Sequence, residues 1–187
     1  MSTLLRFSDV ACWRGGRLLF ENLSFGLVEG EGLWLRGPNG AGKSSALRLA
    51  AGLLRPIAGQ VEAERLALAD EGLALDRELP LSRALRFWVK SRALDEAFAA
   101  LNLTHLADVP VRLLSTGQAR RARLVRVAAS GAGLWLLDEP LSGLDAASIP
   151  LVTALIDRHR ARGGAVLLTS HQPLPPEGWR TLDLAVA

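Results

Sequence analysis

The sequence contains no tyrosine, one methionine, one cysteine and three histidines among its 187 residues. The single thiol, Cys12, cannot form a disulfide within the chain, and it has no second thiol with which to build a metal site. These absences exclude a disulfide-stabilised scaffold and a cysteine-based metal centre. We therefore expect Cys12 to be a small buried residue.

Long hydrophobic runs are also absent, although 49% of the residues are hydrophobic. The run from Val127 to Leu137 lies between Arg126 and Asp138, and it is far shorter than the roughly 20 apolar residues that cross a bilayer. Residues 1–6 lack the basic and apolar segments of a secretion signal. We expect one domain over residues 1–187 that remains in the cytoplasm.

A strong charge imbalance is missing as well, because lysine and arginine exceed aspartate and glutamate by only 3. One basic stretch contains Arg120, Arg121, Arg123 and Arg126. The conservative interpretation of this stretch is a solvated helix face. The alternative is a surface for nucleic acid or acidic lipid.

The order of the apolar segments predicts an α/β fold. Partial alternation over residues 18–28 predicts a strand that pairs with the segment from Leu4. Short apolar segments at 33–36, 134–137 and 166–169 predict buried strands. A helix at about 147–162 separates the last two, an alternation typical of a mainly parallel sheet.

The middle of the chain predicts a small helical subdomain, at about residues 72–130, inserted into this core. Residues 83–93 and 94–101 have helical spacing, and Pro80 and Pro110 flank them.

Residues 37–44 fit the pattern G-x-x-x-x-G-K-[ST] at every fixed position. A short strand precedes this loop and a helix over residues 43–53 follows it, as a phosphate-binding loop requires. Lys43 would neutralise the β- and γ-phosphates, and the Ser44 hydroxyl would ligate Mg²⁺. The predicted nucleotide-binding residues are Gly37, Pro38, Asn39, Gly40, Ala41, Gly42, Lys43, Ser44 and Ser45. This loop alone does not choose among kinases, GTPases and transport ATPases.

Two carboxylates, Asp138 and Glu139, follow the apolar segment at residues 134–137. At the carboxyl end of a parallel strand, such side chains emerge beside the nucleotide crevice. Asp138 would hold Mg²⁺, usually through water, and Glu139 would orient and deprotonate the attacking water.

Residues 114–118, Leu-Ser-Thr-Gly-Gln, resemble the LSGGQ signature of ABC ATPases, with Thr116 in place of glycine. The segment Ser-Gly-Leu-Asp at 142–145 resembles the D-loop of that family, and His171 matches its switch histidine. These motifs stand in the family's order over nearly the whole chain. The resemblance implies an ABC ATPase fold: a mainly parallel sheet core, an antiparallel β subdomain and a small helical subdomain.

The same resemblance implies a mechanism that needs two copies of the domain. In this family the phosphate loop of one domain faces the signature of another, and two ATP molecules lie between them. The residues that would complete the partner's site are Ser115, Thr116, Gly117, Gln118 and Asp145. His171 would contact the γ-phosphate and position Glu139, whereas His105 and His159 are expected to be structural.

Two further assignments rest on this resemblance. Trp13 is the aromatic residue best placed to stack on adenine, although its position is offset by one residue. Glu71 stands where the family usually has a glutamine that contacts Mg²⁺, and a carboxylate there can only accept hydrogen bonds.

Several strings are similar to the ATP-binding subunit of the haem exporter of cytochrome c maturation, the CcmA type. They lie at residues 17–25, 85–88 and 170–174. This resemblance implies a peripheral ATPase, bound to an integral membrane partner at the cytoplasmic face of the inner membrane. The chain has no Cys-x-x-Cys-His motif, so direct haem binding is not expected.

Three alternatives stay open on the sequence. The chain could be the ATPase subunit of another ABC exporter, or a soluble ABC ATPase that acts on nucleic acid or ribosomes. It could also be a regulator that binds ATP and scarcely hydrolyses it, as Glu71 and Thr116 suggest.

Overall fold

The computed structural model describes residues 2–70, 72, 75–88, 91–170 and 178–184. Its central layer is a five-stranded sheet in the order β5-β6-β7-β3-β8, in which every neighbouring pair is parallel. The strands are β3 (Gly32–Arg36), β5 (Leu66–Ala69), β6 (Leu134–Asp138), β7 (Ala165–Thr169) and β8 (Trp179–Asp183). The predicted parallel sheet is confirmed. Strands β6 and β7 are almost entirely buried, which explains their unbroken apolar sequences.

A second sheet is antiparallel and has the order β2-β1-β4. It consists of β1 (Thr3–Arg14), β2 (Arg17–Val28) and β4 (Ala58–Ala63). Strands β1 and β2 form the predicted pair, joined by Gly15 and Gly16. Both glycines have positive φ, 61° and 79°, as a two-residue hairpin of type I′ requires.

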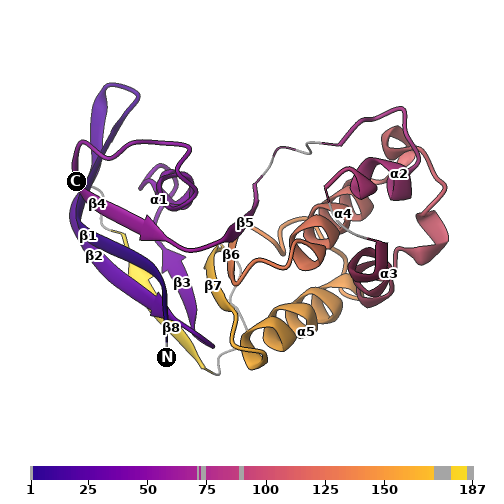
Figure 1. The fold of residues 1–187 in the computed structure, drawn as a ribbon. Coiled ribbons are helices and arrows are strands. Elements are labelled where there is room, and N and C mark those ends of the chain that lie inside the picture. Colours follow the sequence, from indigo (N-terminus) through magenta and orange to yellow (C-terminus); the bar gives the residue numbers. More distant parts are fainter. Residues whose placement is uncertain (1, 71, 73–74, 89–90, 171–177, 185–187) are drawn as a thin grey trace.

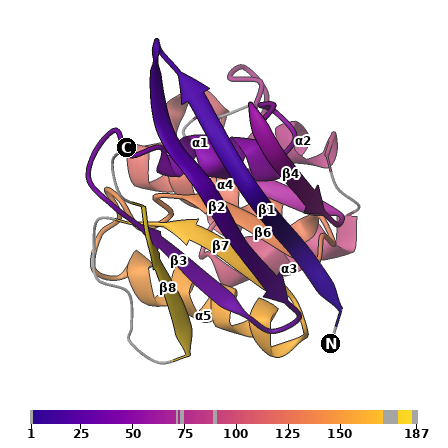
Figure 2. The same cartoon turned by 90° about the vertical axis from the view of Figure 1, so that its left-hand side faces the viewer.

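Helix α1 (Lys43–Ala50) lies between the two sheets, and the β1–β2 hairpin crosses over it (Figure 1, Figure 2). The other helices lie on the far side of the parallel sheet (Figure 1). They are α2 (Leu81–Arg86), α3 (Ser91–Ala100), α4 (Thr116–Ala129) and α5 (Ser148–Ala161), with short 3-10 helices η1 (Thr104–Leu106) and η2 (Val111–Leu113).

Helix α2 ends earlier than the periodicity of residues 83–93 predicted. Pro80 precedes its first residue, and the N–H of Trp88 donates to the Leu85 carbonyl in the turn that follows Arg86. Pro80 is the N-cap of α2, and its fixed φ and extended ψ suit the residue that precedes the first helical turn. The boundary between a nucleotide core and a helical subdomain remains a prediction.

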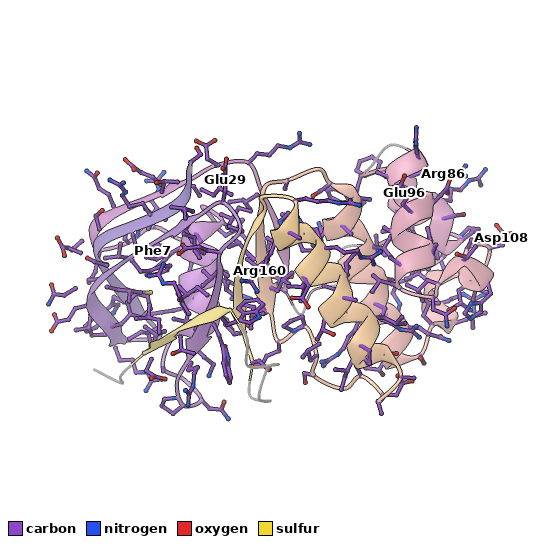
Figure 3. The ribbon with its side chains drawn as sticks, turned by 90° about the horizontal axis from the view of Figure 1, so that it is seen from below. Phe7, Glu29, Arg86, Glu96, Asp108 and Arg160 are labelled. Carbon is purple, nitrogen blue, oxygen red and sulfur yellow. The ribbon has the colours of Figure 1, made fainter. Side chains whose placement is uncertain are left out.

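The parallel sheet separates two hydrophobic cores. Leu134 and Leu136 face α1 and the antiparallel sheet, whereas Trp135 and Leu137 face the helices α2 to α5. Alternate residues of one strand point to opposite faces, so a single strand supplies both cores. Figure 3 places Phe7 in the first of these layers and Arg86 at the opposite end of the molecule. Cys12 is buried in the first core, as predicted, and burial raises the pKa of its thiol.

The described helices include none that is both long enough and apolar enough to cross a membrane.

Candidate nucleotide site

The phosphate loop runs from the end of β3 to the start of α1, in the context that the sequence predicted. Gly42 is the N-cap of α1 and has a φ of 101°. A Cβ at this position would lie 2.9 Å from the Phe20 ring and be strained by the positive φ. The close approach of the hairpin to the loop therefore depends on this glycine. The loop presents the unpaired N–H groups of a helix N-terminus, which favour an anion.

Lys43 is 8% exposed, and its ammonium group lies inside the loop. Its Nζ donates to the carbonyl oxygens of Gly37 at 2.7 Å and Pro38 at 3.1 Å. Ser44 is half-buried and Ser45 is buried. A buried cation needs hydrogen-bond acceptors, so these carbonyls fix the position of the positive charge within the loop.

Asp138 is the last residue of β6 and Glu139 follows it, beside a threonine that the sequence did not identify. The Thr169 hydroxyl donates to Asp138 Oδ1 at 2.7 Å and accepts from the Glu139 N–H at 3.0 Å. Thr169 is 1% exposed, and it lies opposite Asp138 in the parallel β6–β7 pairing. One hydroxyl thus holds the Asp138 carboxylate and the Glu139 backbone. The signal available in the sequence was a hydroxyl residue at the end of the neighbouring strand.

Lys43 and the two carboxylate residues, Asp138 and Glu139, line a cavity of about 430 Å³. The phosphate loop, the start of α1 and the carboxylates at the end of β6 form part of its wall, and the β1–β2 hairpin supplies the rest. The lining residues are Arg14, Gly15, Arg17, Leu19, Asn39, Gly40, Gly42, Lys43, Ser44, Ser45, Asp138 and Glu139. Trp13 is not among them, and its side chain is 56% exposed. The stacking role of Trp13 remains a prediction.

The signature residues lie outside the lining of this cavity, at the start of α4. Ser115 is the N-cap: its Oγ accepts from the Gln118 N–H at 3.3 Å, and its own N–H donates to Gln118 Oε1 at 2.8 Å. This reciprocal pair is a capping box. The serine and glutamine of the signature therefore have a local structural role that holds the segment at the surface.

Asp145 fixes the beginning of α5. Its Oδ1 accepts from the Ser148 N–H at 2.8 Å. Hydrogen bonding to Ser148 lowers the pKa of the Asp145 carboxyl, so the group is a carboxylate at neutral pH. Gly143 lies near the start of α4, since a Cβ on Gly117 would be 3.8 Å from the Gly143 carbonyl oxygen. The D-loop and the signature are thus neighbours.

The basic stretch forms part of helix α4, as we expected. The face that carries its arginines is not fully solvated, which differs from our interpretation of the sequence. Its arginines are half-buried and their guanidinium groups donate to backbone carbonyls. The acceptors are Ser142 for Arg120, Leu101 for Arg121 at 2.9 Å, Asp70 for Arg123 at 3.1 Å and Leu68 for Arg126 at 2.8 Å. These contacts join α4 to the surrounding loops. The same contacts weaken the case for a nucleic-acid surface on this stretch.

Two predicted site residues, His171 and Glu71, lie outside the described residues. Within the described part of the chain, no group of three or more histidine, cysteine or acidic residues could hold a metal ion.

His159 has the structural role that we predicted. It stacks on Trp135 with centroids 3.8 Å apart and bonds to the Gly133 carbonyl at 3.1 Å. Burial lowers the pKa of its imidazole.

Comparison with known proteins supports the motif assignment. Residues 20–142 match the family model described as "ABC transporter". The chain is 59% identical over 177 residues to the cytochrome c biogenesis ATP-binding export protein CcmA of Sphingopyxis alaskensis, and the match covers 91% of each chain. It is 52% identical to the protein of the same name from Zymomonas mobilis, a match that covers 94% of this chain and 82% of the relative.

Solved structures agree with the fold. The chain resembles the ATP binding subunit of an ABC transporter with a TM-score of 0.83 and 25% identity, covering 90% of this chain and 80% of the other. A nucleotide-free ATP-binding cassette from an ABC transporter gives a TM-score of 0.77 at 19% identity, covering 91% and 82%.

Proposed function

The chain belongs to the ABC transporter ATP-binding family, within the group of cytochrome c biogenesis ATP-binding export proteins, and we propose that it hydrolyses ATP for such an export complex. The observation that carries this proposal is the cavity in which a phosphate loop, a buried lysine and two strand-end carboxylates meet. This is the set of groups that binding and hydrolysis of a nucleoside triphosphate require.

The residues fit Mg²⁺ and ATP. The loop offers backbone N–H groups and the Lys43 ammonium to the phosphates, and Ser44 and Asp138 both line the cavity as oxygen donors for Mg²⁺. Bound Mg²⁺ would neutralise charge on the phosphates. Thr169 holds Asp138 through a hydrogen bond to its Oδ1 oxygen, which leaves Oδ2 as the oxygen that would face the metal. Glu71 stays a proposed further ligand of the metal.

Glu139 is the proposed general base for the attacking water. It lines the cavity, and its backbone is fixed by the bond from its N–H to Thr169. Its φ of 49° is unusual for a residue other than glycine, and such backbone strain often occurs at functional positions. His171 is proposed to contact the γ-phosphate and assist Glu139.

The site of one chain is proposed to be half of the working site. The phosphate-loop cavity and the exposed signature of one chain lie in different places. A second copy would present Ser115 and Gly117 to the phosphates, with Thr116, Gln118 and Asp145 beside them. Two ATP molecules would then lie between the copies, so an isolated monomer should hydrolyse poorly.

The complex is proposed to lie at the cytoplasmic face of the inner membrane, bound to an integral subunit, with ATP hydrolysis serving haem export for cytochrome c biogenesis. The 59% identity to a relative of that name supports this role. Deletion of the gene followed by measurement of c-type cytochromes tests it, and normal cytochrome levels would refute the haem assignment. Purification from membranes should also recover an integral partner.

The enzymatic part of the proposal has a separate test. Glu139→Gln should bind ATP as wild type does, lose most turnover and accumulate as an ATP-bound dimer, because the amide cannot accept the proton from water. A wild-type protein without ATPase activity, alone or with its membrane partner, would favour the regulatory alternative. Equal turnover in wild type and variant would refute the assignment of Glu139.

A further inference from the structure

The nucleotide cavity has a cationic wall that the sequence motifs do not account for. Arg14 and Arg17 line the cavity from the β1–β2 hairpin. They are the last residue of β1 and the first of β2, directly opposite each other across the Gly15–Gly16 turn. The tight type I′ turn fixes this pairing, because both of its glycines have positive φ.

This arrangement places two like charges side by side on one face of a hairpin. Such a pair is destabilising in a sheet unless something compensates it. Within the described residues, neither arginine has a carboxylate within salt-bridge distance. The compensation that the fold provides is instead polar: Arg17 Nη2 donates to the Gly40 carbonyl at 2.8 Å and Arg14 Nη1 to Ser45 Oγ at 3.3 Å.

Both contacts are made to the phosphate loop and the first turn of α1. The two guanidinium groups are therefore held at the place where an anion would bind. Strand alternation explains why Arg14 rather than Trp13 has this position. Trp13 pairs with Leu18 at the next register position, so its side chain points to the other face of the hairpin.

We propose that Arg14 and Arg17 form a clamp that binds the phosphate chain of the nucleotide from the β1–β2 hairpin. The clamp rests on the proposed function, since it deepens the description of the same ATP site. Guanidinium groups form charge-assisted, often bidentate hydrogen bonds with phosphate oxygens. A bound phosphate chain would add its negative charge to the polar contacts that already compensate the like-charged pair.

The test measures binding of two probes, ATP and inorganic tripolyphosphate, by calorimetry at constant Mg²⁺. Arg14→Ala and Arg17→Ala should each raise the Kd of both probes by a similar factor, about tenfold, as expected when one charge-assisted hydrogen bond is lost. Arg14→Lys should lose less affinity for both probes than Arg14→Ala, because lysine keeps the positive charge. Arg6→Ala, an exposed arginine of the same strand outside the cavity lining, is the matched control and should bind both probes as wild type does.

Several outcomes overturn the clamp while leaving the ATP site intact. A loss confined to ATP, with tripolyphosphate unchanged, would mean that the arginines contact the base or the sugar. Unchanged binding of both probes in the alanine variants would mean that the two arginines contact no part of the nucleotide. A wild type that binds ATP but not tripolyphosphate would also refute the clamp. Only a wild type that binds no ATP would refute the proposed function itself.

The folding of the variants is checked without ligand. Arg14 and Arg17 are both exposed, so thermal unfolding of the ligand-free alanine variants should stay close to that of wild type. If Arg17→Ala is destabilised through loss of the Gly40 contact, Arg14→Ala and Arg14→Lys still decide the matter.

Discussion

The hydroxyl of Thr169 offers a sharp test of how the carboxylate pair is positioned. Thr169→Val keeps the shape of the side chain and removes its hydrogen bonds to Asp138 Oδ1 and the Glu139 N–H, at 2.7 and 3.0 Å. A hydrogen bond to a charged group contributes about 1.5–3 kcal/mol and a neutral one about 1 kcal/mol. Asp138 is half-buried and can recruit water, so the expected loss lies slightly below the sum of the two smallest contributions, at about 2 kcal/mol. For a chain of this size, that loss lowers Tm by about 4–8 °C.

The effect on catalysis should exceed the effect on binding. The valine variant leaves both carboxylates in place but removes the hydroxyl that holds the Asp138 carboxylate and the Glu139 backbone. Displacements on the order of 1 Å can reduce kcat about a hundredfold. We expect kcat for ATP to fall about tenfold or more. The Kd for ATP should change less than about threefold, because Thr169 does not line the cavity.

Thr169→Ser is the matched control, since it retains the hydroxyl and loses only a methyl group. Steady-state ATPase assays and calorimetric titrations with ATP would be run on both variants beside wild type. The reasoning fails if Thr169→Val hydrolyses ATP at the wild-type rate, or if the serine variant is impaired as strongly as the valine variant. The second result would assign the role of Thr169 to packing of its methyl group.

Three other predictions concern separate parts of the chain. Gly42→Val should abolish ATP binding and lower Tm, because a Cβ at this position would lie 2.9 Å from the Phe20 ring and the residue has a φ of 101°. Circular dichroism melts and nucleotide titrations check this prediction, and wild-type affinity for ATP would contradict it. Glu139→Gln should reduce turnover at least a hundredfold and elute as an ATP-dependent dimer in size-exclusion chromatography. The depressed pKa of His159 means that the folded state favours the neutral ring, so the stability it contributes is present above about pH 6.5 and falls as pH drops through the folded pKa. His159→Gln should therefore show a smaller loss of Tm than wild type between pH 7.5 and 5.5, and an equal loss would refute this.

The sequence predicted the parts of the fold that depend on local patterns. Unbroken apolar segments identified β3, β6 and β7, and the glycine loop with its following helix identified the phosphate site. The exposed strand β4 and the short strand β5 were not predicted. Strand β4 has almost no buried residue and so no apolar periodicity, and β5 owes its assignment to pairing with β6.

The site residues that the sequence did not identify were missed for one shared reason. Thr169, Arg14 and Arg17 carry no motif, and each becomes significant only through its partner across a sheet or hairpin. Thr169 lies opposite Asp138 because β6 and β7 are parallel and in register. Arg14 meets Arg17 because the turn contains two residues. Pairing partners distant in sequence are a property of topology, which single-sequence periodicity does not contain.

The start of α4 shows how one segment can serve both the fold and the proposed second copy. Ser115 Oγ accepts a hydrogen bond from the Gln118 N–H, so its hydroxyl hydrogen is not used in the capping box. That hydrogen is available to a phosphate oxygen of another chain without loss of the cap. The unpaired N–H groups of the first helical turn offer further donors, and the positive end of the helix favours a negative charge. Substitution of Ser115 by alanine removes both roles, whereas threonine retains a capping oxygen and a donor. ATP-dependent dimerisation should therefore survive Ser115→Thr far better than Ser115→Ala, and equal dimerisation of the two variants would show that the hydroxyl does not bind the partner's nucleotide.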